Sequence, residues 1–89
     1  MSNRLYNKKQ EVVNMSFNRL LLMSKKSREA LLNQQGIVIE DIQSEINMGK
    51  VYINHHEYPA RSISGKDYPR DTVVKVMRVS RFYVYVKMV

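Results

Sequence analysis

The chain has 89 residues, no cysteine and a formal net charge of +7. This length supports a single domain with one hydrophobic core, and the lack of cysteine excludes disulfide frameworks and thiolate metal sites. Residues 1–34 carry seven Lys and Arg against two Asp and Glu, whereas residues 35–89 carry eight against six. The basic leading segment favours acidic partners, such as anionic lipid headgroups, nucleic acid or an acidic protein face.

The leading segment has a helical pattern, and we interpret residues 1–34 as a basic, amphipathic helical unit. Good helix formers predominate there, and no Gly or Pro occurs before Gly36. Apolar residues three and four positions apart share one face: Val13, Phe17, Leu20 and Leu21. The pattern predicts one helix from Leu5 to Asn33, or two helices with a break near Ser24–Ser27. Gly36 is expected to end the helix, because glycine readily adopts the left-handed conformation of a helix stop.

No segment of the leading half is long enough to cross a bilayer. Its longest apolar run, residues 20–23, is far shorter than the roughly 20 residues that a membrane-spanning helix needs. We therefore expect a cytoplasmic chain that is also able to lie at a membrane surface. The helix is expected to cover an end of its own barrel, with an anionic membrane or a second chain as alternatives. The residues that would then contact a membrane or partner are Phe17, Leu20, Leu21, Lys25 and Lys26.

After Gly36 the apolar period shortens toward two, which is typical of β-strands. Five strands are predicted, at residues 36–42, 49–53, 57–62, 72–79 and 81–89. Asn54-His55 is predicted to form a tight hairpin turn, because both residue types tolerate positive φ. Five short strands separated by turns favour a small β-barrel or sandwich.

The last predicted strand has the clearest alternation of side chains. Phe82, Val84, Val86 and Met88 are expected to face one side, and Tyr83, Tyr85 and Lys87 the other. One face should therefore belong to the core, and the other should be at least partly solvated.

Four stretches in the strand region follow a known family pattern. They are a glycine-led strand at Gly49–Ile53, the motif Tyr58-Pro59-Ala60-Arg61-Ser62, a threonine-led valine-rich strand at Thr72–Val79, and the terminal Val84-Tyr85-Val86. On these residues, the segment 33–89 resembles the C-terminal soluble domain of the NfeD-like proteins. That family is membrane-associated and often encoded beside stomatin- or flotillin-like proteins. The chain departs from the family at Arg70-Asp71 and at His55, where glycines are usual.

The resemblance implies a fold that is mainly β with an N-terminal α-helix: a five-stranded barrel of the oligonucleotide/oligosaccharide-binding (OB) type over residues 35–89. It implies a non-enzymatic interaction module in membrane-protein assembly or quality control, with a stomatin- or flotillin-like partner. Family members normally carry transmembrane helices before the barrel, and longer ones add a serine protease domain.

Catalytic and metal chemistry find little support in the sequence. His55 and His56 are adjacent, so in a strand they would point to opposite faces and could not easily share a metal. No Gly-x-Ser-x-Gly motif occurs, and three glycines are too few for a phosphate loop or dinucleotide fingerprint. We therefore expect no enzyme, no cofactor and no metal.

The candidate binding residues lie on the exposed face of the last hairpin: Lys75, Arg78, Arg81, Tyr83, Tyr85 and Lys87. Aromatic rings beside cations are how OB barrels bind single-stranded nucleic acid, which is the alternative function. The same tyrosines could instead pack beneath the helix or contact a protein. A further alternative is a structural protein that forms homo-oligomers through its helix.

Overall fold

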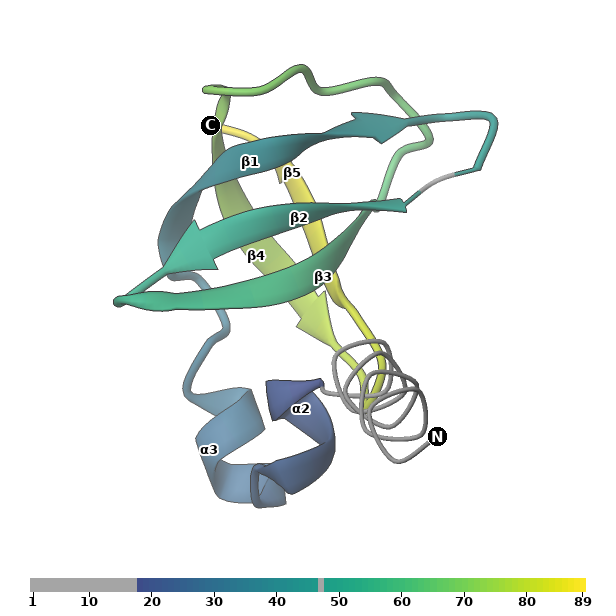
Figure 1. Ribbon diagram of the computed structural model, residues 1–89. Coiled ribbons are helices and arrows are strands. Elements are labelled where there is room, and N and C mark those ends of the chain that lie inside the picture. Colours follow the sequence, from purple (N-terminus) through teal and green to yellow (C-terminus); the bar gives the residue numbers. More distant parts are fainter. Residues whose placement is uncertain (1–17, 47) are drawn as a thin grey trace, which may run out of the picture.

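The computed structural model describes residues 18–46 and 48–89, which form a closed five-stranded barrel capped by two short helices (Figure 1). The elements are α2 (Arg19–Leu22), α3 (Lys25–Glu29), β1 (Gln35–Gln43), β2 (Met48–Ile53), β3 (His56–Ser62), β4 (Val73–Val79) and β5 (Val84–Met88). The strand order around the barrel is β1-β2-β3-β5-β4, with β3 and β5 parallel and the other neighbours antiparallel. The predicted barrel is thus confirmed.

The helical segment is broken at Met23 and Ser24, as one of the two sequence interpretations had it. Asn18 caps α2, because its side-chain oxygen accepts a hydrogen bond from the Leu20 N–H at 2.9 Å. Ser24 caps α3, accepting from the Ser27 N–H at 3.1 Å. A second N-cap requires extended backbone at Ser24, which separates the two helices. The part of the predicted helix before Asn18, including Phe17, lies outside the described residues.

The helical stop was predicted at the wrong residue. Asn33, with φ of 69°, takes the left-handed conformation, and Gly36 lies inside β1. Asparagine also reaches this conformation at low cost. From there the chain joins the barrel, since the Asn33 N–H donates to the Val76 carbonyl at 2.9 Å and the Val76 N–H donates to the Gln34 carbonyl at 3.0 Å.

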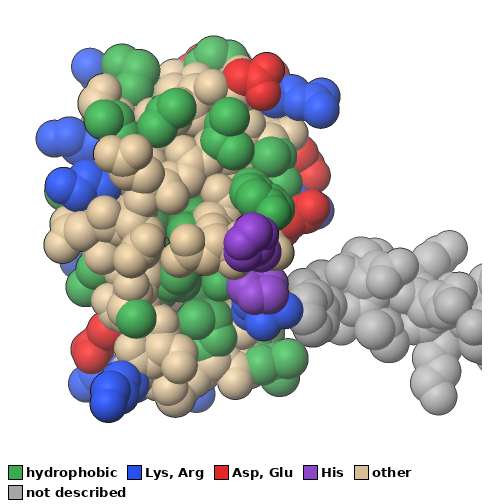
Figure 2. All heavy atoms as spheres, turned by 90° about the vertical axis from the view of Figure 1, so that its left-hand side faces the viewer, with side chains coloured by type: hydrophobic (Ala, Val, Ile, Leu, Met, Phe, Trp, Pro, Cys, Tyr) green, Lys and Arg blue, Asp and Glu red, His purple; other side chains and the backbone are tan. Residues whose placement is uncertain are grey.

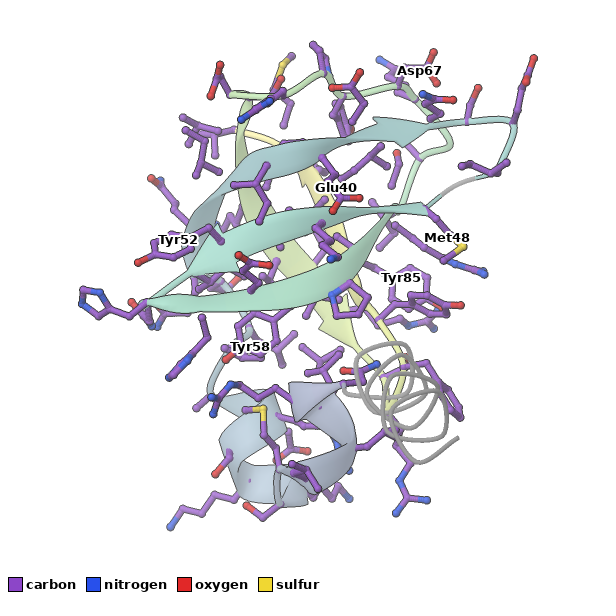
Figure 3. All side chains as sticks on the ribbon, viewed as in Figure 1. Glu40, Met48, Tyr52, Tyr58, Asp67 and Tyr85 are labelled. Carbon is purple, nitrogen blue, oxygen red and sulfur yellow. The ribbon has the colours of Figure 1, made fainter. Side chains whose placement is uncertain are left out.

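The barrel core extends into the helices. Leu20 is fully buried and packs with Leu31 beneath the barrel, and α2 lies against β3. In Figure 3, Tyr58 of β3 points toward this helical end. The two helices thus cover an end of the barrel, which is the placement expected from the sequence. The expectation that Leu20 faces a membrane or partner is wrong, because the core takes this side chain. The remaining core residues come from the barrel and its loops: Val38, Ile42, Val51, Ile53, Tyr58, Ala60, Tyr68, Val74, Val76, Val84 and Val86.

Among the described residues, neither α2 nor α3 has the length or the apolar character that crossing a bilayer requires.

Two turns show how residues other than glycine reach positive φ in this chain. Asn54 and His55 have φ of 48° and 70°, which confirms the predicted tight hairpin between β2 and β3. Asp71, at a position where NfeD-like proteins usually have glycine, has φ of 75°. Its N–H donates to the Val38 carbonyl at 2.8 Å, which holds the turn against β1. Asp and Asn adopt this conformation more readily than other side-chain-bearing residues, so the departure from the family pattern leaves the turn intact.

The last strand is shorter than predicted. It begins at Val84, because the Ser80 side-chain oxygen accepts hydrogen bonds from the N–H groups of Phe82 and Tyr83 at 3.1 and 3.0 Å and holds these residues in a turn. Phe82 is consequently 57% exposed, and Met88, the last residue of the strand, is 58% exposed. Phe82 and Met88 are therefore not part of the buried face, whereas Val84 and Val86 are fully buried as expected.

A charged hydrogen bond holds the long β3–β4 connection to the opposite end of the barrel from the helices. The Asp67 carboxylate accepts from the Ser44 N–H at 2.5 Å, and this hydrogen bond lowers the Asp67 pKa (Figure 3). A carboxyl group with a lowered folded-state pKa stabilises the fold above its unfolded-state pKa of about 3.9. That stabilisation is lost as the pH falls through the folded-state pKa.

We therefore expect Asp67→Asn to lower the melting temperature at pH 7, because the amide can still accept the hydrogen bond but without its charge. The deficit relative to wild type should shrink to nothing as the pH falls below the folded-state pKa. Thermal melts between pH 2.5 and 7, followed by circular dichroism, measure this difference in melting temperature. Glu45→Gln removes a carboxylate from the β1–β2 turn that contains Ser44, and it serves as the control. A deficit that stays the same from pH 7 to pH 2.5 would contradict the assignment.

Candidate interaction surface

Two tyrosines lie side by side on the outside of the barrel. Val84 and Val86 point inward, so Tyr85 between them points outward, where Figure 3 shows it at the side of the barrel. Tyr83 precedes the strand, and its ring meets that of Tyr85 edge-on, with centroids 6.5 Å apart at an interplanar angle of 73°. Both rings are half-buried. They form an aromatic surface that is partly open to solvent.

Two arginines from the neighbouring strands lie against these rings. The Arg61 guanidinium of β3 is 4.1 Å from the Tyr83 ring centroid, and that of Arg78 of β4 is 5.8 Å from the Tyr85 ring centroid. Both distances fall within the range of cation–π attraction, at about 6 Å or less. We call these four residues, Arg61, Arg78, Tyr83 and Tyr85, the tyrosine–arginine patch.

Two features of the sheet bring the arginines to this side. The parallel pairing of β3 with β5 places Arg61 opposite Tyr85. Arg78 follows the inward-facing Val74 and Val76 at alternate positions, so a regular strand would point it into the core. A register shift between Val76 and Arg78 turns it outward.

The structure brings together only part of the predicted binding site. Arg78, Tyr83 and Tyr85 form one cluster. Lys75 and Lys87 occupy opposite positions on the neighbouring strands β4 and β5, farther along the sheet, and Arg81 is exposed on the connecting turn. Arg61 was missed, although its neighbours Ala60 and Ser62 are buried and therefore leave it facing outward.

Within residues 18–46 and 48–89, no acidic side chain forms an ion pair with the cations on this side of the barrel. In the described part of the chain the ion pair present joins Lys50 to Glu40 at 3.2 Å, away from the patch. The Arg61 guanidinium lies over the Tyr83 ring, and its Nε atom is buried with no hydrogen-bond partner among the described residues. An approaching acidic group would therefore meet unpaired positive charge beside the tyrosines.

The β2–β3 side, which many OB barrels use for ligands, is chemically different here. Its cleft of about 320 Å³ is lined by residues that include Lys50, Glu57 and both histidines (Figure 2 shows the histidines at the surface). Lys50 is neutralised by Glu40, and the Tyr52 hydroxyl lies 3.5 Å from the His55 Nδ1 atom. Burial raises the pKa of Tyr58 against a smaller opposing effect of Arg19. No group of three His, Cys, Asp or Glu able to hold a metal occurs in the described ranges.

Among the described residues, those predicted to contact a membrane or partner through the helix lie on α2 and α3, outside the tyrosine–arginine patch. Lys25 and Lys26 are exposed on α3, and Leu21 is 46% exposed on α2. Its neighbour Leu22 is the most exposed large apolar residue of the described part, at 77%.

Solved structures with the same fold come from three organisms. The C-terminal domain of stomatin operon partner protein 1510-C from Pyrococcus horikoshii superposes with a TM-score of 0.63 at 18% identity, over 70% of this chain and 92% of that domain. The soluble domain of a membrane protein implicated in regulation of membrane protease activity from Corynebacterium glutamicum gives 0.62 at 21% identity, over 68% and 95%. The soluble domain of the NfeD protein YuaF from Bacillus subtilis gives 0.56 at 17% identity, over 99% and 95%.

No family model matches the sequence, and no curated protein matches it. The likeness is thus one of fold, and it agrees with the barrel built from the strand pairing.

Proposed function

We propose that this chain, whose barrel is of the NfeD-like OB type, is a non-enzymatic module that binds another protein through its tyrosine–arginine patch. The observation that carries the proposal is the patch itself: two half-buried tyrosines held by two arginines, with no carboxylate paired to them among the described residues. Tyr and Arg are the residue types most enriched at the energetic centres of protein interfaces. The exposed Phe82 ring, 6.5 Å from that of Tyr83, adds apolar area beside it.

We propose a stomatin- or flotillin-like protein as the partner, within membrane-protein assembly or quality control. Two of the proteins with the same fold support this choice by their names: one is a stomatin operon partner, and the other is implicated in regulating membrane protease activity. The module would act in the cytoplasm beside a membrane on which that partner is anchored.

The patch makes a quantitative prediction for partner binding. Tyr83→Ala combined with Tyr85→Ala should weaken binding to a stomatin-like domain from the same genome by about tenfold or more, because a central interface residue contributes about 2 kcal/mol or more. Surface plasmon resonance with the immobilised partner measures the affinity.

Tyr52→Ala is the matched control, because Tyr52 is a 41% exposed tyrosine on β2. It should leave the affinity unchanged. Failure of the wild-type chain to bind, or an equal loss with Tyr52→Ala, would contradict the proposal.

Single-stranded nucleic acid is the second candidate, favoured by the same pairing of aromatic rings with cations on a barrel of OB type. A stacked base needs an open ring face, however, and the Arg61 guanidinium already covers one face of Tyr83. The test is a fluorescence titration with a short labelled oligonucleotide at low and moderate salt. Salt-dependent binding that the double tyrosine variant abolishes would favour this candidate over protein binding.

A further inference from the structure

A cleft of about 600 Å³ lies between α3 and β4, next to the tyrosine–arginine patch. Four cationic side chains line it, from α3, β4 and the turn after β4: Lys25, Arg28, Arg78 and Arg81. Among the described residues that line the cleft, one carboxylate, that of Glu29, accompanies them. The cleft is therefore a positively charged recess of ligand size.

The lining of the cleft also contains apolar side chains that remain exposed to solvent. Leu32, Ile63 and Met77 line the cleft and are 40%, 45% and 39% exposed. Covering them would remove apolar surface from water, which is favourable. An occupant that combines acidic with apolar groups would satisfy both parts of the lining.

Two of the four arginine and lysine side chains are held in place before any ligand arrives. The Arg28 Nη1 atom donates to the Met23 carbonyl at 2.7 Å, and the Arg78 guanidinium lies over the Tyr85 ring. Side chains that are already ordered lose less conformational entropy on binding. Arg78 also belongs to the patch, so the cleft and the patch form one continuous surface.

We propose that this cleft binds an acidic peptide segment of the partner protein that also carries apolar residues. The inference rests on the proposed function as a protein-interaction module. It specifies that the partner carries an acidic, partly apolar segment, and it adds a second contact region to this chain. A peptide fits better than a membrane surface, because three apolar residues line a cleft, whereas Leu22, the most exposed leucine of the described residues, does not line it.

The test uses a fluorescein-labelled hexapeptide with two central leucines and two acidic residues on each side, followed by fluorescence anisotropy. Lys25→Gln with Arg81→Gln removes two cations of the cleft that do not belong to the patch. This pair should weaken binding by about tenfold or more, as expected for two charge-assisted contacts. Lys26→Gln with Lys87→Gln removes the same charge from α3 and β5 outside the cleft, and it should change the affinity less than about threefold.

The apolar part of the cleft has its own test. Leu32→Ser should weaken peptide binding severalfold, whereas Leu22→Ser, outside the cleft, should not. A second probe with serines in place of the leucines should bind more weakly to the wild-type chain. Equal effects of the two leucine variants would overturn the apolar contribution.

Failure of the inference can be distinguished from failure of the proposed function. If the stomatin-like domain binds but the peptide does not, or if both charge pairs lower peptide affinity equally, the cleft assignment is wrong and the module remains. If the peptide binds in the cleft but the stomatin-like domain does not bind, the proposed partner is wrong. Capture by phosphatidylglycerol vesicles that only the Lys25 and Arg81 pair abolishes, without peptide binding, would overturn the peptide in favour of a lipid surface.

Discussion

Leu20→Ala is expected to lower the free energy of unfolding by about 2–5 kcal/mol. Leu20 is fully buried and packs into the core at the helical end of the barrel, so its removal leaves a cavity between α2 and the strands. Most of the other core side chains are valines and isoleucines, which are too short to extend into the space. Urea denaturation followed by circular dichroism gives the change in free energy.

Leu22→Ala provides the comparison within the same helix. It removes the same atoms from a side chain that is 77% exposed, and it should change stability by less than about 0.5 kcal/mol. Similar losses for the two variants would show that α2 does not dock on the barrel through Leu20.

Gly49→Ala should destabilise the barrel by about 3 kcal/mol, at the upper end of the usual cost of overpacking. A Cβ atom at Gly49 would lie 2.7 Å from the carbonyl oxygens of Glu40 and Asp41 and from the Ile42 Cγ1 atom. Backbone oxygens cannot rotate away as a side chain can, so β1 would have to move off β2. The melting temperature and the denaturant midpoint both report this loss.

Gly65→Asn is the contrasting substitution. It adds a larger side chain where nothing lies within 4 Å, at a φ of +78° that asparagine tolerates. Its effect should stay within about 0.5 kcal/mol. If Gly49→Ala proved equally neutral, the close approach of β1 and β2 at this point would be contradicted.

The features predicted correctly from the sequence depend on local chemistry. Alternation of apolar residues identified all five strands, and the tolerance of Asn54 and His55 for positive φ identified the hairpin. The serine at the start of α3 lay inside the predicted break. Each of these preferences is set within a few residues, so a single sequence carries it.

The features that were missed depend on pairing or on competition between local preferences. Arg61 reaches Tyr83 only because β3 and β5 are parallel neighbours, and nothing local to either segment shows that pairing. The Ser80 side chain draws Phe82 into a turn that strand periodicity could not indicate. Both Asn33 and Gly36 can adopt the conformation that ends a helix, and Asn33 does so. Gly36 lies instead in β1, where a Cβ atom would lie only 2.5 Å from the Ile53 Cγ1 atom.

The two backbone hydrogen bonds of Val76 with Asn33 and Gln34 have a consequence for how the protein opens. They continue the β1–β4 pairing back to the residues that follow α3. The helices α2 and α3 therefore cannot detach from the barrel without breaking hydrogen bonds in the middle of β4. Amide hydrogen exchange at Asn33 and Val76 should therefore proceed at the rate of global unfolding. A fragment truncated at Gln35 would lose both this anchorage and Leu20, and it would report on a weakened barrel.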